Sequence, residues 1–245
     1  YNVAGLPQGI SQSDPIVNSP QIAVKLNRFD VVLVQEDFFY HYFLRYGAAH
    51  PYQSRPDYSR GSLGDGLNRF SFCAFSDHER IGWDACYGYI DHASDCLTPK
   101  GFSVARHEIA EGVYVDIYNL HMDAGSDAKD HDARSVGTDQ LIETILSFSD
   151  GYAVIAAGDY NMRYSSPEGN ANLERLTSST QLIEAAIALG IDNDRIDMVF
   201  YRSSDTVALQ PTAYKVETDI FADGNGQPLS DHDAISVLFE WVASQ

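Results

Sequence analysis

Several apolar segments of this sequence end in side chains that are able to bind a metal or to move a proton. The apolar run 153–157 is followed by Asp159 and Asn161, and other apolar runs lead into Glu36 and into His121. Carboxylate and amide oxygens are ligands of hard divalent cations, and histidine is the side chain used most often for proton transfer. Asp and Asn also shape turns, so one such segment end is weak evidence. Their coincidence indicates a catalytic site at the edge of a sheet.

Further candidates stand near the two ends of the chain. Asp197 precedes one apolar segment, Asp231 and His232 precede the last one, and Asn2 opens the sequence. Taken singly, Asp197 reads as a surface carboxylate, the Asp231-His232 pair as a solvated loop and Asn2 as a turn residue. Asp123 has the weakest functional case. Together these residue types suit the attack of water on a phosphoester, in which negative charge builds up on the oxygens around phosphorus.

The order of these motifs resembles that of the endonuclease/exonuclease/phosphatase superfamily, which includes pancreatic-type deoxyribonucleases, inositol polyphosphate 5-phosphatases and neutral sphingomyelinases. The resemblance extends from Asn2 to the end of the chain. It rests on Tyr1-Asn2-Val3, Gln35-Glu36, Asn119-Leu120-His121, Gly158-Asp159-Tyr160-Asn161, Arg195-Ile196-Asp197 and Ser230-Asp231-His232. It implies an α/β fold, the four-layer α/β sandwich of DNase I-like proteins, with two mixed β-sheets packed face to face and helices outside. It also implies cleavage of a phosphoester bond.

The resemblance also implies a metal site. Glu36 matches the principal metal ligand, Asn2 the neighbour that holds a metal-bound water or a phosphate oxygen, and Asp231 a further carboxylate of the metal site. The expected cofactor is Mg²⁺, or another divalent cation such as Mn²⁺, because such cations take oxygen ligands.

Five catalytic roles follow from the same resemblance. Asp159 and Asn161 match the pair that positions the attacking water and the phosphate. His232 matches the general base or transition-state partner, and Asp197 the carboxylate that fixes its tautomer and raises its basicity. His121 matches the histidine that contacts phosphate or assists the leaving group.

The middle of the chain is similar to the neutral sphingomyelinase branch. The pattern consists of Lys100-Gly101-Phe102, the strand end at His121, and then Asp132, Arg134 and Gln140. The formal charge of −19 suits a phospholipid head group better than a nucleic acid, whose many phosphates an acidic surface repels. We therefore expect a sphingomyelinase-type phospholipase C with peripheral membrane contact, although no exposed aromatic hairpin is evident.

Three alternatives stay open at this point. An inositol polyphosphate phosphatase or a DNase-like endonuclease of the same fold would need a basic pocket or groove. The candidates for it are Arg55, Arg60, Arg69 and Arg163. A non-catalytic binding module that has kept the fold is the third alternative, and the retention of several catalytic residue types together argues against it.

Composition indicates one globular domain, residues 1–245. Its 44% hydrophobic residues suffice for a large core, and no apolar run has the length of a membrane span. We expect a monomer. Cys73 reads as a buried, inert thiol, and a bridge between Cys86 and Cys96 is left open. The sequence starts without methionine, inside or just after an expected strand, so part of the N-terminal strand is expected to be missing before Tyr1, where any export signal would also have stood. A secreted or periplasmic location is slightly favoured.

The elements that position these residues alternate between helix and strand. A helix is expected to start at Ser19-Pro20, and 47–70 and 164–172 read as loops. The other expected helices are 138–148 and 182–189, and the expected strands are 31–35, 70–75, 102–106, 113–120, 153–157, 195–201 and 234–241.

Overall fold

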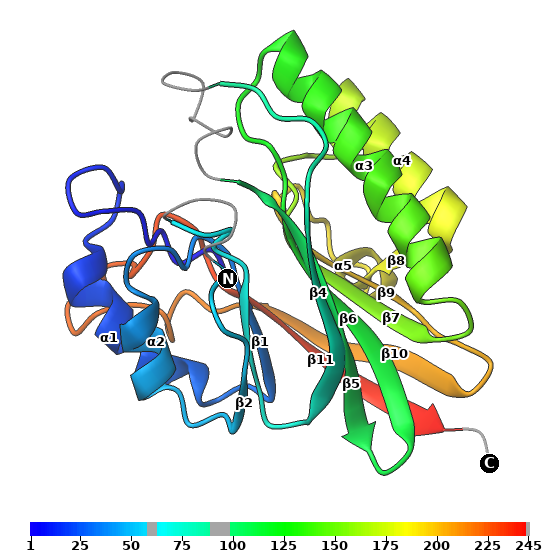
Figure 1. Ribbon diagram of the computed structural model, residues 1–245, viewed down its shortest axis with the longest axis horizontal. Helices are drawn as coiled ribbons and strands as arrows, with labels where there is room; N and C mark the ends of the chain where they lie inside the picture. Colours follow the sequence, from blue (N-terminus) through cyan, green and yellow to red (C-terminus); the bar gives the residue numbers. More distant parts are fainter. Residues whose placement is uncertain (58–62, 89–98, 244–245) are drawn as a thin grey trace.

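Two layers of β-strands form the centre of the molecule, and helices cover their outer faces. The computed structural model describes residues 1–57, 63–88 and 99–243 (Figure 1). The larger sheet has the strand order β4-β5-β6-β7-β9-β8. Its strands are β4 (Phe75–Gly82), β5 (Gly101–Ala110), β6 (Val113–His121), β7 (Ala153–Asp159), β8 (Ile183–Glu184) and β9 (Asp197–Arg202). The β6–β7 pair is parallel and the other pairs are antiparallel, so this sheet is mixed.

The second layer consists of a three-stranded sheet and a long hairpin. The order β1-β3-β2 joins β1 (Val31–Val34), β2 (Tyr52–Gln53) and β3 (Asn68–Ser71), and β10 (Val207–Val216) pairs with β11 (Ile235–Ala243). Side chains from both layers share one core, in which Val31 and Leu33 pack against Val115 and Ile117. The expected face-to-face packing of two sheets is therefore confirmed.

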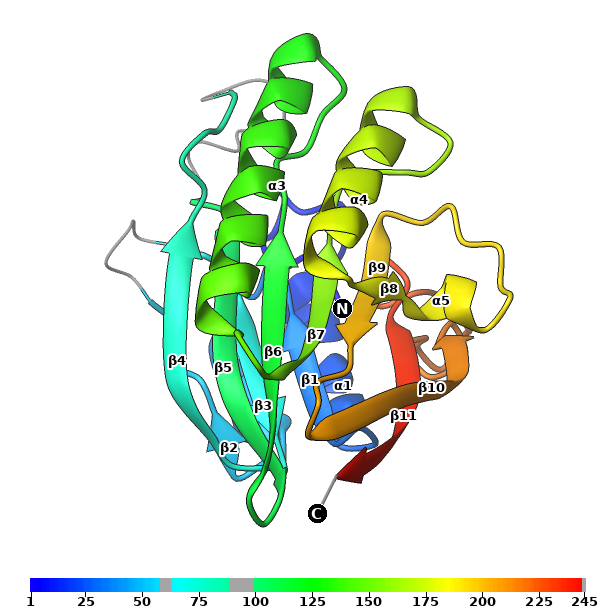
Figure 2. The same cartoon turned by 90° about the vertical axis from the view of Figure 1, so that its right-hand side faces the viewer.

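Five helices complete the described chain. α1 (Pro15–Leu26) and α2 (His41–Gly47) lie on the side of β1, whereas α3 (Ala128–Phe148) and α4 (Pro167–Thr180) cover the larger sheet (Figures 1 and 2). The short α5 (Ala185–Ala188) follows β8. This order of helix, sheet, sheet and helix gives the four layers expected from the sequence. Within the described residues, no helix has the length and apolar character needed to cross a bilayer.

A buried asparagine ties the two layers together. Asn119 on β6 donates from Nδ2 to the carbonyl oxygens of Val34, at 2.9 Å, and of Asn68, at 3.1 Å. Its Oδ1 accepts a bond of 2.6 Å from Gln35 Nε2. Because buried polar groups are costly when unpaired, these three bonds fix the offset of β6 relative to β1 and β3.

Arg69 links the layers a short distance away and is not part of a basic groove. Its side chain is fully buried and donates to Ile117 O at 3.0 Å and to Ser103 Oγ at 2.9 Å, while Nη1 lies 3.3 Å from His107 Nε2. Its proposed neighbour Arg60 lies outside the described residues. Arg69 is therefore unable to meet a polyanion at the surface, which corrects its assignment as a candidate for the groove.

Several expected boundaries were wrong, and three of them have a local reason. The first helix begins at Pro15, with Pro20 inside it, because Pro15 already fits the first helical turn. The expected loop 164–172 ends at Ser166, because Ser166 accepts a bond from Gly169 N at 3.0 Å and caps α4, which starts at Pro167. The helix expected at 138 starts at Ala128, where Asp127 and Asp130 form a capping box.

The helix expected over 182–189 is instead the two-residue β8 followed by the four-residue α5. The strand expected over 70–75 is broken after Ser71, so half-buried Cys73 lies between β3 and β4 rather than in the core. α2, β4 and β10 were not anticipated, and the expected loop 47–70 contains β2 and the start of β3. Cys86 is disulfide-bonded, and Cys96 lies outside the described residues.

The buried His107 predicts a pH-dependent stability. Burial, together with the charge of Arg69, lowers the pKa of His107 to about 3. The unfolded chain takes up a proton on this histidine below its ordinary pKa of about 6.5, but the folded chain does not. The stabilisation is complete above pH ~6.5 and is lost as the pH falls toward 3. Between pH 6.5 and pH 3, protonation of His107 in the unfolded chain lowers the free energy of unfolding by up to about 1.4 kcal/mol per pH unit.

We expect the free energy of unfolding to fall less steeply between pH 6.5 and pH 4 in His107→Gln than in the parent chain, as measured by urea titration at several pH values. Identical slopes for the two chains would contradict this account of His107.

Candidate functional site

Strand register sets three of the expected site residues in one row. His121 on β6 is paired with Asp159 on β7, and Asp159 is paired with Asp197 on β9. Paired residues on adjacent strands present their side chains on the same face, close enough to interact. His121 Nε2 lies 3.4 Å from Asp159 Oδ2. These side chains lie at the carboxyl-terminal ends of β6 and β7, where parallel strands usually carry their functional residues.

The glycine before Asp159 lets these strands approach each other. A Cβ atom on Gly158 would lie 2.0 Å from the carbonyl oxygen of Leu120 on β6. Any larger residue at this position would push β7 away from β6 and separate His121 from Asp159.

The second layer contributes Glu36 and Asn2. Asn2 forms an isolated parallel bridge with Gln35, and this bridge brings its side chain next to Glu36. Asn2 Nδ2 lies 3.0 Å from Glu36 Oε1 and 3.3 Å from Asp159 Oδ2, so one carboxamide spans the two layers. Its Oδ1 accepts from Ala4 N at 3.1 Å. In this orientation Asn2 offers N–H groups, not oxygen, to the carboxylates.

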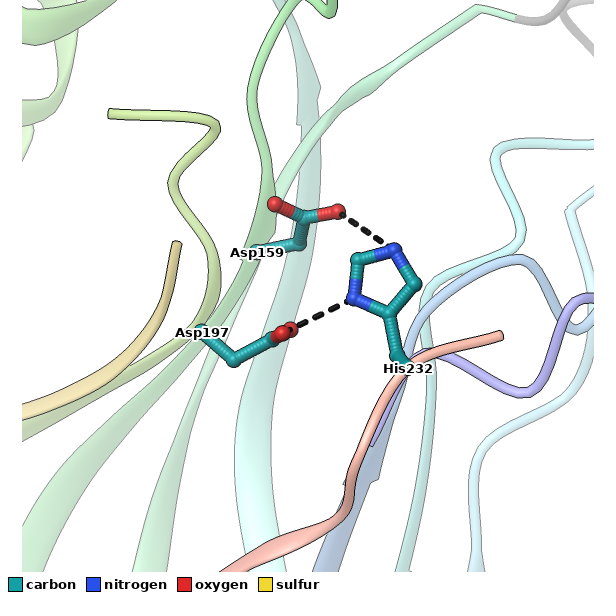
Figure 3. Close-up of side chains that lie close together, drawn as sticks. All are labelled: Asp159, Asp197 and His232. Carbon is teal, nitrogen blue, oxygen red and sulfur yellow. Dashed lines mark hydrogen bonds and ion pairs between the residues drawn. The ribbon is translucent and has the colours of Figure 1, made fainter. Parts of the chain in front are cut away.

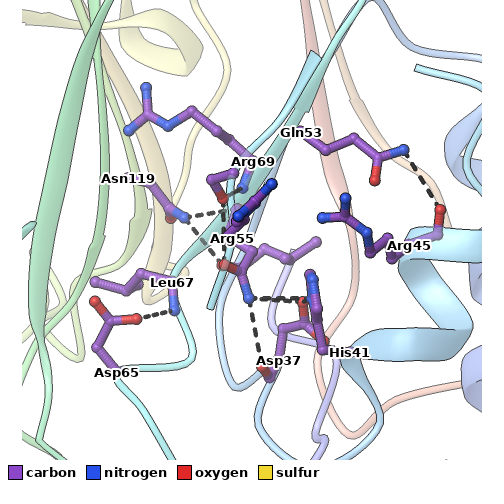
Figure 4. Close-up of polar contacts among 12 residues, drawn as sticks. Asp37, His41, Arg45, Gln53, Arg55, Asp65, Leu67, Arg69 and Asn119 are labelled. Carbon is purple, nitrogen blue, oxygen red and sulfur yellow. Dashed lines mark hydrogen bonds and ion pairs between the residues drawn. The ribbon is translucent and has the colours of Figure 1, made fainter. Parts of the chain in front are cut away.

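Buried polar residues around Asp37 hold the backbone of Glu36 in place. Glu36 adopts a left-handed conformation, with φ of 56°, which a non-glycine residue keeps only when its surroundings impose it. The next residue, Asp37, accepts a 2.9 Å bond from Asn68 Nδ2 and lies 2.5 Å from His41 Nδ1 (Figure 4). Asp37 N also donates to Gly66 O at 3.0 Å.

His232 completes the site from the loop before β11. Its Nδ1 lies 2.8 Å from Asp197 Oδ2, and its Nε2 faces Asp159 Oδ2 at 3.8 Å (Figure 3). The same Nε2 is 3.5 Å from Asn2 Nδ2. Ser230 Oγ donates to the carbonyl oxygen of Asn2 at 2.7 Å and so anchors this loop to the start of the chain.

The acidic surroundings shift the pKa values of the central pair. Burial alone would lower the pKa of His232, but its hydrogen bond with Asp197 and the charges of Asp197, Asp159 and Asp231 raise it to about 9. Burial raises the pKa of Asp159 to about 7, and the negative charge of Asp197 adds to this effect. The site therefore has an excess of negative charge that is only partly balanced by one imidazolium.

Glu36 and His121 respond to the same environment. Burial raises the pKa of Glu36, against the opposing hydrogen bond from Asn2 and the charge of Lys100. Burial, with smaller contributions from Lys100 and His232, holds the pKa of His121 well below its usual range. His121 is thus neutral at neutral pH.

The donor set fits a hard divalent cation. Asp159, Asp197 and His232 bring one ligand atom each within 4.8 Å of one another. Asp197 Oδ1 is buried and lacks a hydrogen-bond partner. Burial raises the pKa of Glu36 and of Asp159 although the charges of Lys100 and His232 oppose the shift, so additional positive charge would favour the ionised form of both carboxylates. A divalent cation bound by carboxylate oxygens would supply that charge.

Two expected site residues lie at its margin. Asp231 is exposed, accepts a bond from Ser230 Oγ at 3.3 Å and acts on Glu36 and His232 through its charge. Asn161 donates from its backbone N to Asp159 Oδ1 at 3.0 Å and from Nδ2 to Met122 O at 3.1 Å. Asn161 therefore braces Asp159 against the loop after β6.

The pattern downstream of His121 has a supporting role. Arg134 Nη1 donates to the carbonyl oxygens of Asp123 and Gly125, at 3.1 and 3.0 Å, and so fixes the loop after β6. Gln140 donates to Gly82 O at 3.0 Å. Asp132 is exposed on α3. Asp123 accepts from Tyr87 N at 2.9 Å, which is a structural contact.

Three residues of the site were not assigned from the sequence. Lys100 reaches Glu36, Asp159 and His121 through its charge. Trp83 Nε1 donates to the carbonyl oxygen of His121 at 2.7 Å, and Ser230 fixes Asn2. Lys100 and Ser230 stand within motifs recognised in the sequence, so the signal was present, whereas Trp83 carried none.

Comparison with known proteins identifies sphingomyelinases among the relatives. A protein named sphingomyelinase from Mycobacterium tuberculosis and another from Mycobacterium bovis are each 32% identical to the chain over 264 aligned residues, which include 99% of this chain and 52% of the relative. The chain thus spans about half the length of these curated relatives. No protein-family model matches the sequence.

Solved structures with the same fold include three kinds of protein. Sphingomyelinase C from Streptomyces griseocarneus superposes with a TM-score of 0.69 at 18% identity, covering 96% of each chain. A beta toxin from Staphylococcus aureus gives 0.70 at 15% identity, with 97% of each chain covered. A humanized TDP2 from D. rerio gives 0.73 at 20% identity, covering 98% of this chain and 96% of the other. The DNase I-like fold expected from the motifs is confirmed.

We expect Asp197→Asn to lower the pKa of His232, because the carboxylate both accepts the hydrogen bond from Nδ1 and supplies negative charge beside the ring. Titration of the ring resonances by NMR would measure the change. Asp231→Asn is the matched control and should have a smaller effect, since Asp231 acts on His232 through charge alone. Equal shifts in the two variants would refute the Asp197–His232 pairing.

Proposed function

The chain belongs to the endonuclease/exonuclease/phosphatase superfamily and is most like its sphingomyelinase branch, and from this premise we propose that it is a divalent-cation-dependent phosphodiesterase that hydrolyses sphingomyelin in the manner of a phospholipase C. The observation that carries the proposal is the single cluster in which Asn2, Glu36, Asp159, Asp197 and His232 meet at the junction of the two sheets. It combines carboxylates for a cation with a histidine whose orientation is fixed.

The geometry suggests a division of labour among these residues. Asp197 holds His232 by Nδ1 and leaves Nε2 directed toward Asp159, so Nε2 is the position for proton transfer. Asp159 is the acceptor that orients the attacking water, and Asn2 donates N–H groups toward the same point. Neutral His121 stands on the other side of Asp159 and is placed to contact the phosphate or the leaving group.

We propose that the cation is Mg²⁺ and that Glu36 is its main ligand. Asp231, Asp159 and Asp197 are further candidate ligands. When bound, the cation would offset negative charge on the phosphate oxygens. A beta toxin of Staphylococcus aureus with the same fold has been solved with bound magnesium ions, at a TM-score of 0.66 and 14% identity over 87% of each chain. That likeness supports a divalent cation at this site.

The basic residues do not favour a polyphosphorylated or polymeric substrate. Arg69 is buried between the sheets, Arg163 donates to the carbonyl oxygen of Asp194, and Arg80 is paired with Asp65 at 2.5 Å. Arg55 is exposed beside them. With a formal charge of −19, the chain is better suited to a ligand with one phosphate. The phosphocholine head group meets this condition, whereas a nucleic acid does not.

Exposed apolar side chains near the site support contact with a membrane surface. Phe39 is 57% exposed and Ile10 is 70% exposed. Phe39 N donates to Gly5 O at 3.1 Å, so this segment lies close to the strand that carries Asn2. Tyr42 and Tyr46 add exposed aromatic rings on α2. Such side chains suit the boundary between water and lipid. We further propose that the protein is a monomer and that it acts outside the cytoplasm. The disulfide at Cys86 supports the second point, because disulfides persist in oxidising compartments.

Chelation should abolish turnover, and added Mg²⁺ or Mn²⁺ should restore it. Glu36→Gln should raise the metal concentration needed for half-maximal activity by at least about tenfold, because one ligand charge is removed. The thermal midpoint serves as the control and should stay near that of the parent. Full activity of the metal-free enzyme would exclude this mechanism.

The substrate is tested by measuring phosphocholine release from sphingomyelin in mixed micelles beside cleavage of plasmid DNA and of inositol phosphates. Sphingomyelin should be hydrolysed fastest at physiological salt. His232→Ala should lower kcat by roughly 10²–10⁴-fold, while the half-exposed His131→Ala serves as the matched control and should leave kcat unchanged. Faster cleavage of DNA would replace the assignment with a nuclease.

A further inference from the structure

The ring of His121 is held less firmly by hydrogen bonds than the ring of His232. His232 Nδ1 lies 2.8 Å from Asp197 Oδ2, a normal hydrogen-bond distance. His121 Nε2 lies 3.4 Å from Asp159 Oδ2, and its Nδ1 is buried without a hydrogen-bond partner among the described residues. The direction of the His121 ring therefore depends on the backbone at the end of β6.

Trp83 holds that backbone with its side chain. It follows β4, whose last residue Gly82 is paired with Gly101 on β5, and Gly101 is paired in turn with His121. The indole Nε1 donates to the carbonyl oxygen of His121 at 2.7 Å. The backbone N of Trp83 donates to Lys100 O at 3.2 Å. A single residue thus binds both the end of β6 and the residue before β5.

Close packing confines the indole of Trp83. A Cβ atom on Gly101 would lie 2.1 Å from Ile81 O, so any side chain there would push β4 away from β5. A Cβ atom on Gly137 of α3 would lie 3.2 Å from the indole ring. The indole also packs against Phe102, with the ring centroids 5.0 Å apart. Because the space between β5 and α3 is filled in this way, packing sets the direction of Nε1.

Gln140 on α3 holds the chain on both sides of Trp83. Its Nε2 donates to Gly82 O at 3.0 Å, and its Oε1 accepts from Asp84 N at 3.0 Å. β4 is the outermost strand of the larger sheet, so this carboxamide pairs with backbone groups that a further strand would otherwise bind. Gln140 does not enter the catalytic cluster, but it reaches that cluster through Trp83 and His121.

The loop that follows His121 is held from the same side. Tyr87 N, four residues after Trp83, donates to Asp123 Oδ2 at 2.9 Å. On the opposite side, Met122 N donates to the carbonyl oxygen of Asp159 at 2.8 Å. The end of β6 is therefore fixed between the segment that contains Trp83 and the catalytic end of β7.

We propose that Trp83 is a positioning residue for His121 and that Gln140 holds Trp83 in place for this role. The indole N–H fixes the peptide group of His121, and this group sets the direction in which the ring extends toward Asp159. Trp83 packs against the core beneath α3, whereas the His121 ring belongs to the row on the other face of the sheet. Packing on the helix side is thus transmitted to the site through one backbone carbonyl.

The inference rests on the proposed function, in which His121 contacts the phosphate or the leaving group. Trp83→Phe keeps an aromatic ring in the same space and removes the N–H. We expect it to lower kcat for sphingomyelin in mixed micelles about tenfold, because a small displacement of a catalytic group has a large effect on rate. Trp241→Phe, the same change at the other tryptophan of the chain, is the matched control and should leave kcat unchanged.

The KM and the Mg²⁺ concentration for half-maximal activity should change by less than about twofold in Trp83→Phe, since a contact that acts only in the transition state alters kcat. A double-mutant cycle then separates positioning from a general loss of structure. If Trp83 acts through His121, Trp83→Phe should have no further effect on kcat in the His121→Ala background. Equal fold losses in the two backgrounds would overturn the proposal.

Gln140→Leu leaves the indole in place and provides a second variant if Trp83→Phe is too unstable to assay. It should also lower kcat, and it should add little to the effect of Trp83→Phe, because both variants disturb the same contact. An unchanged kcat in Gln140→Leu would refute the role assigned to Gln140.

NMR tests the contact without substrate. The indole proton of Trp83 should exchange with solvent at least about tenfold more slowly than that of Trp241, whose side chain is 41% exposed. Trp83→Phe should shift the ring resonances of His121 and leave those of the half-exposed His131 unchanged. Unshifted His121 resonances would overturn the proposal. A parent chain that hydrolyses no phosphoester would overturn the proposed function, and the His121 resonances would then decide this inference.

Discussion

One carboxamide joins the two sheets at the point where the chemistry is placed. Asn2 Nδ2 lies within 3.3 Å of carboxylate oxygens from both layers, Glu36 on one and Asp159 on the other. A shift of either sheet by one residue would turn these side chains to the opposite face. The buried bonds of Asn119, which link β6 to β1 and β3, prevent such a shift. The site therefore depends on polar contacts inside the core, although the core itself is held together by apolar packing.

The same arrangement explains the electrostatics. Strand register brings Asp159 and Asp197 side by side, and the second layer adds Glu36 at a short distance. Burial raises the pKa of both Glu36 and Asp159, and the acids together raise that of His232. Carboxylates that are crowded in this way are a cost to the folded protein unless a cation or a proton offsets their charge. The negative charge is therefore a property of the site that favours a cation. The formal charge of −19 over the whole chain is also negative.

Residues that look alike in the sequence have different roles in the structure. Arg134 and Gln140 belong to the pattern that is similar to sphingomyelinases, yet they hold loops and do not enter the cluster. Their likeness to the family therefore reflects the support of the site more than its chemistry. Arg69 looked like part of a basic groove and is instead a buried link between the sheets. An arginine exposed at the surface would instead have favoured a ligand with several phosphates.

The sequence by itself determined the class of fold, the identity of the residues in the cluster and the order in which the chain supplies them. The fold class and the residue roles follow from the order of its short motifs, which resembles that of the superfamily, whereas the hydrophobic pattern placed only Glu36, His121 and Asp159 at the ends of apolar segments. Local signals of capping were misread at Ser166 and Asp127, since these depend on single hydrogen bonds. Only the tertiary structure decided which residues meet. The pairing of Asp197 with His232 and the contact of Asn161 with Met122 O join residues that are 35 and 39 positions apart in the sequence. The exposure of Asp231 was likewise set by the fold. Such contacts follow from register and from the packing of two sheets, which no local pattern in the sequence encodes.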